Sequence, residues 1–232
     1  MAVVTGATGA LGRVVTRRLL LEGASVVALF RSEEKFNLLK NYVGETANLS
    51  GFKGDATTEE GCKGLVDSAL KEHGHVDVMM NIAGGYRGGF TLAETSVGDW
   101  DWLMNLNLRS VYLSCRTVIP HMIERDYGRI VNISAKTSSR EGRKSKSAAY
   151  AVSKAGVRVL TEALAEEVSK YNINVNCVMP SVIDTEANRA AYPKARYGNW
   201  VPPSDIADLI VFLSSDASSH IRGACIPIYG KS

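Results

Sequence analysis

The chain has no long apolar run and no basic tract. None of its apolar segments approaches the ~18 consecutive residues that a membrane-spanning helix requires. Its formal net charge is only +3, and its three tryptophans are not interleaved with lysine or arginine as they are in many nucleic-acid-binding faces. These absences exclude an obvious membrane span and argue against a nucleic-acid partner.

Cysteine and histidine are also scarce. The four cysteines form no C-x-x-C pair and stand far apart: Cys62, Cys115, Cys177 and Cys225. Only two of the four histidines are close together, and they flank a glycine. No metal site is therefore expected. We interpret the cysteines as buried, reduced thiols of a cytoplasmic protein, and the apolar N-terminal run leads to a glycine loop instead of a signal-peptide cleavage site.

Short apolar runs alternate with segments of helical periodicity along the whole chain. The length of 232 residues, with 45% hydrophobic and 22% charged residues, suits one globular domain spanning 1–232. The expected strands are 1–5, 25–30, 51–54, 76–81, 129–134, 174–179 and 224–228. Because strands and helices alternate, we predict an α/β fold with a doubly wound, Rossmann-like parallel sheet in a three-layer α/β/α arrangement.

The first turn of the chain is rich in glycine. It lies between an apolar strand and a helical pattern, where glycines let the backbone approach a pyrophosphate at the helix N-terminus. Tight packing of strand against helix is the alternative explanation. The residues expected to contact a dinucleotide here are Gly6, Thr8, Gly9, Leu11 and Gly12.

Arg31 and Ser32 follow the second expected strand, where a nucleotide-binding unit meets the adenosine ribose. An acidic residue here would bind the 2′-hydroxyl group, whereas an arginine can accommodate a 2′-phosphate. No acid stands at position 31. We therefore predict NADP(H) in preference to NAD(H), with a solvated loop arginine as the alternative.

Tyr150 and Lys154 are four residues apart in an alanine-rich segment that favours a helix, so they are expected on one helical face. A free phenol titrates near pH ~10, too high for acid–base work at neutral pH. A nearby ammonium group lowers that pKa, whereas desolvation raises it. By itself the pair is common on ordinary helices.

A segment with the spacing of a capping box, from Thr57 to Glu60, predicts a further helix that ends at Gly74.

Taken together, these motifs resemble the short-chain dehydrogenase/reductase family over essentially the whole chain. Thr5, Gly6 and Gly12 match its T-G-x-x-x-G-x-G motif, with Ala10 at the middle glycine. The remaining matches are an adenine-contacting acid at Asp55, N-N-A-G at 81–84, a helix asparagine at Asn107, Y-x-x-x-K at 150–154 and P-G-x-I-x-T at 180–185, where Ser181 replaces glycine.

The resemblance implies reversible hydride transfer between a nicotinamide and a carbonyl group or a related C=N bond. Tyr150 would be the general acid and base, Lys154 would hold the nicotinamide ribose, and Asn107 would hold a water of the proton relay. It also implies a homotetramer or homodimer built on the helices that bear Asn107 and Tyr150. The cofactor contacts that it adds are Asp55, Asn81, Ala83, Gly84, Tyr150, Lys154, Pro180, Ile183 and Thr185.

One departure concerns the serine that the family places after the fifth strand. Ala135 stands at that position, and Ser134, Thr137 and Ser138 are possible replacements. The family's dihydropteridine reductases also lack this serine, so a pterin-type reductase is an alternative function. A catalytically silent, dinucleotide-sensing binding protein is a second alternative.

Two polar segments are expected around the substrate. The loop after the fifth strand carries a group of cations that could attract an anionic substrate, with a solvated loop as the simpler explanation. They are Arg140, Arg143, Lys144 and Lys146. The stretch 186–201 follows the sixth strand and is expected to form a lid.

Overall fold

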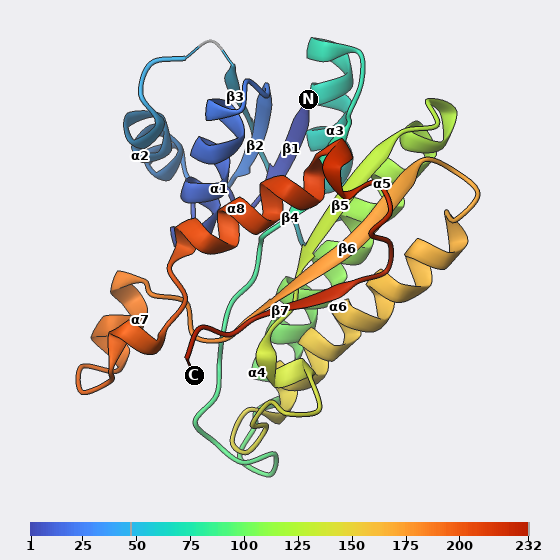
Figure 1. The fold of residues 1–232 in the computed structure, drawn as a ribbon. Coiled ribbons are helices and arrows are strands. Elements are labelled where there is room, and N and C mark those ends of the chain that lie inside the picture. Colours follow the sequence, from blue (N-terminus) through green and yellow to red (C-terminus); the bar gives the residue numbers. More distant parts are fainter. Residues whose placement is uncertain (47, 232) are drawn as a thin grey trace.

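A seven-stranded parallel sheet forms the centre of the protein, in a computed structural model that describes residues 1–46 and 48–231 (Figure 1). The strand order is β3-β2-β1-β4-β5-β6-β7. The strands are β1 (Ala2–Thr5), β2 (Val26–Phe30), β3 (Leu49–Lys53), β4 (Val78–Asn81), β5 (Gly128–Ile133), β6 (Ile173–Pro180) and β7 (Cys225–Ile228). The predicted doubly wound α/β fold is thus confirmed.

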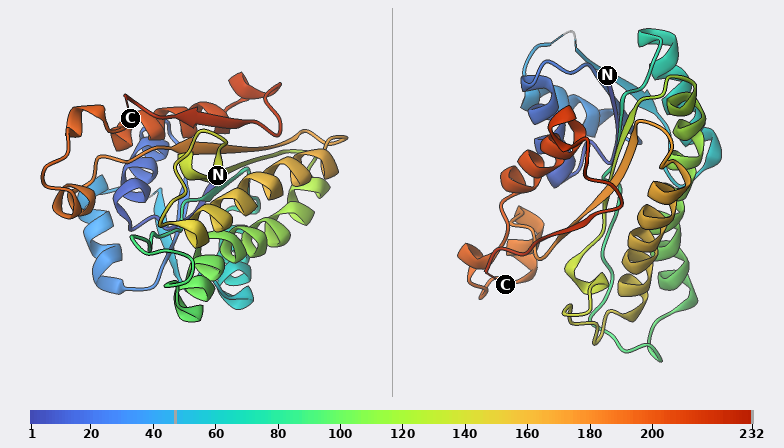
Figure 2. Two further views of the ribbon diagram at one scale, coloured as in Figure 1. Left: turned by 90° about the horizontal axis from the view of Figure 1, so that it is seen from below. Right: turned by 45° about the vertical axis from the view of Figure 1, so that its right-hand side comes forward.

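Helices cover both faces of the sheet, as the two additional views show (Figure 2). One face packs against α1 (Ala10–Leu21), α2 (Glu33–Val43) and α8 (Pro203–Ser214). The other packs against α3 (Glu59–His73), α5 (Ser110–Glu124) and α6 (Ala148–Glu167). Val3 and Val4 of β1 are fully buried in opposite layers, which explains why the strands lack a polar alternation.

The shorter elements lie mainly around the carboxyl ends of the strands. They are α4 (Val97–Leu103), the π-helical η1 (Met104–Arg109), α7 (Glu186–Ala191) and the 3₁₀ turns η2 (Lys136–Ser138), η3 (Tyr197–Asn199) and η4 (Asp216–Ser218). The strand order reverses between β1 and β4, the point at which open α/β sheets commonly bind ligands. The loops after β4, β5 and β6 gather at the lower end of the sheet in Figure 1.

Local capping differs from the sequence prediction at one helix. The N-cap of α3 is Thr58, whose hydroxyl accepts a hydrogen bond from Gly61 N, and not Thr57. Thr57 instead donates its N–H and its hydroxyl to Asp55 Oδ1, both at 2.8 Å. This aspartate outcompetes the helix for Thr57 because its side chain bonds two residues ahead, as in an Asx turn. The predicted C-terminal glycine, Gly74, adopts the expected left-handed conformation.

The cysteines follow the prediction at three positions. Cys62, Cys115 and Cys177 are buried free thiols, but Cys225 is only half-buried because it lies on the edge strand β7. Within the described ranges no group of three or more acidic, histidine or cysteine side chains could hold a metal ion. Over the same residues, no helix combines the length and the apolar character needed to cross a bilayer.

Candidate active site

Tyr150 and Lys154 lie on the first turns of α6, at the carboxyl ends of β4 and β5. The side chain of Lys154 is almost wholly buried, and its Nζ donates a 2.8 Å hydrogen bond to Ile133 O at the end of β5. A Cβ atom added to Gly84 would come within 3.2 Å of the same Nζ. The ammonium group therefore occupies the space between the ends of two neighbouring strands.

Burial changes the titration of both groups. Desolvation lowers the pKa of Lys154 to about 8. Desolvation also raises the pKa of Tyr150 above its ordinary value, with a further contribution from the phenol of Tyr86. From the sequence, Lys154 is predicted to lower the pKa of the Tyr150 phenol. In this structure both contributions to the pKa of Tyr150, desolvation and the phenol of Tyr86, raise it, and Lys154 donates its hydrogen bond to Ile133 O.

Asn107 is fully buried, unlike most amides in the middle of a helix. Its Oδ1 accepts from Gly85 N at 2.8 Å, and its Nδ2 donates to Gly85 O at 3.0 Å and to Ser153 Oγ at 3.1 Å. The π-helical turn explains this orientation, because an extra residue in the turn changes which side chains face inward. Asn107 thus connects the loop after β4 to α6, while its proposed role in a water relay remains a prediction.

Ser153 is a part of this cluster that the sequence reading missed. Its hydroxyl donates to Tyr150 O at 2.8 Å and accepts from Asn107, and its side chain is fully buried. Its position three residues after Tyr150, on the same helical face, is the signal that could have identified it.

The hydroxyl groups near Ala135 are differently engaged. Ala135 itself is buried. Ser134 Oγ donates to Lys154 O at 2.7 Å, and Ser138 Oγ donates to Ala135 O at 2.7 Å, so both hydroxyls satisfy backbone groups. Thr137 Oγ1 is buried and has no hydrogen-bond partner among the residues that the structure describes. Of the three predicted replacements for the family serine, only Thr137 keeps an uncommitted hydroxyl.

Tyr86 was not singled out from the sequence as a site residue, yet its ring lies against that of Tyr150. The ring centroids are 5.0 Å apart and the ring planes meet at 82°, an edge-to-face contact. Tyr86 belongs to the 82–96 segment between β4 and α4 and keeps 53% of its surface exposed. Tyr150 therefore has an aromatic neighbour that belongs to the 82–96 segment.

The glycine loop after β1 packs closely on neighbouring backbone and leads into an exposed helix N-terminus. Gly6 has φ +68°, and a Cβ there would come within 2.6 Å of Ala83 N, while a Cβ on Gly12 would clash with Gly6 O. The helix that follows is capped by the exposed Gly9 and has no acidic residue in its first turn. Free N–H groups at an exposed helix N-terminus favour an anion, so the residues present suit a dinucleotide cofactor.

A cavity of about 390 Å³ lies where the adenosine end is expected. Arg31 is 3.7 Å from Asp55, and its side chain is 72% exposed. Burial acts to raise the pKa of Asp55, but hydrogen bonds from Thr57 and the charge of Arg31 lower it overall. The cavity is lined by Arg31, Asp55, Thr57, Trp102, Asn105, Leu106 and Arg109, of which only the first two were predicted.

The other predicted cofactor residues occupy varied positions. The side chain of Asn81 belongs to the core, where its Nδ2 donates to Asn132 Oδ1 at 2.8 Å. Thr185 caps α7, and Ser32 caps α2. Ile183 pairs with Val201 in an isolated parallel bridge that fastens the two ends of the expected lid. The predicted residues thus lie around the carboxyl ends of the strands, while the side chains of Asn81, Ser32 and Thr185 form hydrogen bonds within the core or at helix N-termini.

The chain matches the family described as short chain dehydrogenase over residues 1–196. It is 32% identical to the 3-oxoacyl-[acyl-carrier-protein] reductase FabG of Thermotoga maritima, over 99% of this chain and 96% of that protein. It is also 32% identical to the 2-dehydro-3-deoxy-D-gluconate 5-dehydrogenase of Escherichia coli, over 99% and 94%. The solved structure of levodione reductase superposes with a TM-score of 0.91 at 25% identity, covering 99% of this chain and 95% of that one.

Proposed function

Since the chain belongs to the short-chain dehydrogenase/reductase family, an oxidoreductase family, we propose that it is an NADP(H)-preferring reductase of carbonyl substrates with Tyr150 as general acid. The observation that carries this proposal is the placement of Tyr150 and the buried Lys154 at the same edge of the sheet as the glycine loop. That edge is where α/β sheets bind ligands.

When bound, a reduced nicotinamide would provide the hydride for the carbonyl carbon. Tyr150 donates its phenolic proton to the carbonyl oxygen, so that a C=O bond becomes CH–OH and the nicotinamide is oxidised. Lys154, whose Nζ is held at Ile133 O, would present its ammonium group to the cofactor ribose. A positioned general acid contributes about 10²–10⁴-fold to the rate, and orientation of the reactants contributes a comparable share.

A substrate panel tests this activity. The purified chain is assayed for carbonyl-dependent oxidation of NADPH with aldehydes, ketones, oxoacids and a quinonoid dihydropterin. We expect turnover of at least one carbonyl compound. Tight NADPH binding without turnover of any compound would instead support a dinucleotide-sensing binding protein.

The cofactor preference depends on Arg31, whose exposed guanidinium group borders the adenosine cavity. We expect NADPH to bind more tightly than NADH, and Arg31→Ala to remove about tenfold or more of the difference, as for the loss of one charge-assisted phosphate contact. Fluorescence titration with both cofactors measures this. Lys53→Ala, which removes a neighbouring exposed cation that pairs with Glu33, is the matched control. Equal affinities in the unmodified protein would refute the assignment.

A pterin-type reductase remains the second candidate because of Ala135. The two nearest serine hydroxyls, on Ser134 and Ser138, are committed to backbone carbonyls, so the usual serine contact to a substrate oxygen is missing at this position. Reduction of the quinonoid dihydropterin at a rate well above that of every ketone in the panel would favour this candidate over the first.

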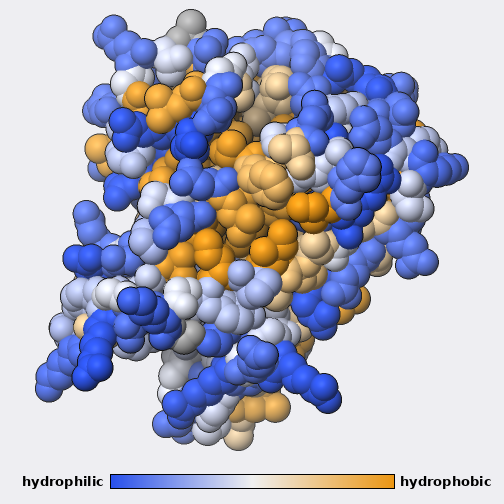
Figure 3. Space-filling model, in the orientation of Figure 1, coloured by the Kyte–Doolittle hydropathy of each residue, from blue (hydrophilic) through white to orange (hydrophobic). Residues whose placement is uncertain are grey.

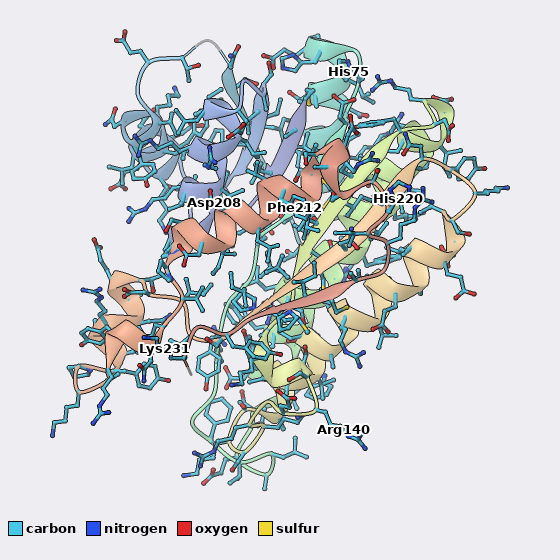
Figure 4. All side chains as sticks on the ribbon, viewed as in Figure 1. His75, Arg140, Asp208, Phe212, His220 and Lys231 are labelled. Atoms are coloured by element: carbon cyan, nitrogen blue, oxygen red, sulfur yellow. The ribbon has the colours of Figure 1, made fainter. Side chains whose placement is uncertain are left out.

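We further propose a cytoplasmic homodimer or homotetramer, and the apolar surface that supports it lies on α8 and β7, apart from the helices that bear Asn107 and Tyr150. Apolar side chains gather over α8 and β7 on the face shown in Figure 3, where Phe212 is 41% exposed and Ile226 and Ile228 are half-buried. Figure 4 shows Phe212 on this helix, apart from Arg140, which lies near the start of α6. Contiguous apolar surface of this kind is typical of subunit contacts. Sedimentation at several concentrations gives the assembly state.

A further inference from the structure

The 82–96 segment is fixed at several successive points beside the general acid. Gly84 packs against Lys154, and both backbone polar groups of Gly85 are held by the side chain of Asn107. Further along, Gly89 N donates a 2.8 Å hydrogen bond to Lys146 O, in the loop that precedes α6. Tyr86 lies between these anchors, so its backbone position is determined by the same groups that surround Tyr150.

The ring of Tyr86 is held but not covered. A Cβ on Gly88 would come within 2.5 Å of Tyr86 Oη, which shows that the phenol lies directly over the backbone of Gly88. Its ring contacts Tyr150 edge to face, and yet 53% of the residue surface is exposed. An aromatic surface is thus presented to solvent immediately beside the proton donor.

The expected lid carries a second group of aromatic side chains. Tyr192, at the end of α7, contacts the ring of Trp200 edge to face with centroids 6.4 Å apart, and Trp200 contacts Tyr197 at 4.9 Å. Tyr192 is 50% exposed. Burial raises the pKa of Tyr86, and the phenol of Tyr192 adds to this shift.

Without the serine contact, the exposed aromatic ring beside Tyr150 becomes more important for orienting a carbonyl substrate. With Ala135 at the serine position, the hydroxyls of Ser134 and Ser138 engaged and that of Thr137 buried, a bound carbonyl lacks the usual serine contact, so more of its orientation must come from contacts to the rest of the substrate. Offset or edge-to-face ring contacts at 4.5–7 Å each correspond to about 2- to 10-fold in binding, and they fix the plane of a flat ligand.

We infer that the site takes a carbonyl compound whose C=O group is conjugated to a planar ring, and that Tyr86 determines this specificity by stacking on the ring. The inference rests on the proposed carbonyl reduction. A flat ring bound with its carbonyl oxygen at the phenol of Tyr150 meets the exposed surface of Tyr86. A saturated ring of the same size is thicker and lacks the π face, so it gains less from this contact.

The test compares acetophenone with cyclohexyl methyl ketone, which have the same number of carbon atoms and differ in the flatness and aromaticity of the ring. The ratio of their kcat/KM values with NADPH is measured in the unmodified chain, in Tyr86→Leu and in Tyr86→Phe. Tyr42→Leu removes a partly exposed ring from α2 and is the matched control. We expect Tyr86→Leu to lower the aromatic-to-saturated ratio by about 3- to 10-fold, and Tyr86→Phe and Tyr42→Leu to change it less than twofold.

The outcomes separate this inference from the proposed function. An unchanged ratio in Tyr86→Leu, with both ketones still reduced, overturns the stacking role of Tyr86 and leaves carbonyl reduction standing. An equal drop in Tyr86→Phe and Tyr86→Leu also overturns it, since the hydroxyl would then be responsible. If no carbonyl compound of either panel is reduced by the unmodified chain, the proposed function fails and the inference fails with it.

Discussion

Tyr150→Phe is expected to lower kcat for carbonyl reduction by at least about 100-fold, which corresponds to about 3 kcal/mol in activation free energy. The substitution removes only the phenolic oxygen. The ring contact with Tyr86 and the packing of α6 should remain, because both depend on the ring and not on the hydroxyl. Affinity for NADPH is therefore expected to stay within about threefold of that of the unmodified chain.

Steady-state kinetics together with fluorescence titration of NADPH separates these two effects. Tyr112→Phe is the matched control, since it removes one exposed hydroxyl from α5. A near-normal kcat in Tyr150→Phe would remove Tyr150 from the proton-transfer step. A large loss of NADPH affinity would indicate a structural role for the hydroxyl instead.

Lys154→Met is expected to abolish turnover and to raise the stability of the fold. The pKa of Lys154 falls from 10.5 to about 8 because its charge is buried. At about 1.4 kcal/mol per pH unit, the buried ammonium group costs roughly 3 kcal/mol below pH 8. Loss of the hydrogen bond to Ile133 O offsets about 1 kcal/mol of this. We therefore expect urea unfolding at pH 7 to give a gain of about 2 kcal/mol.

The difference in unfolding free energy between the unmodified protein and Lys154→Met is expected to depend on pH. Between pH 8 and about 10.5 the unfolded chain still binds the lysine proton while the folded chain has released it, so the stability of the unmodified protein rises with pH in this window. The methionine variant has no such proton, and the difference between the two should shrink across the window. Lys71→Met, an exposed lysine on α3, is the control. A stability difference that is constant from pH 7 to pH 10 contradicts the burial of a charged Lys154.

The local pattern of the chain sufficed for the fold. Apolar runs such as 76–81 gave the strands, and the spacing of Tyr150 and Lys154 placed both on one side of α6. Even there the prediction that Thr57 caps α3 was wrong. Thr57 donates to the side chain of Asp55 instead, and the spacing of a capping box does not reveal this competing acceptor.

The environment of the candidate site could not be read in this way. The inward turn of Asn107 depends on a π-helical turn, and the hydrogen bond of Lys154 to Ile133 joins residues 21 positions apart. The contact of Tyr86 with Tyr150 joins segments from two different crossovers of the sheet. Each depends on how distant elements pack, which periodicity over a few residues does not encode.

The sequence by itself determined that this chain forms a doubly wound sheet with a glycine loop at its first crossover, because strand and helix periodicities and backbone freedom at glycine are local properties. Only the tertiary structure decided that burial raises the pKa of Tyr150 and that an aromatic ring lies against this tyrosine. Desolvation and ring contacts arise from atoms brought together by folding, and their strength is set by the space that the packed elements leave.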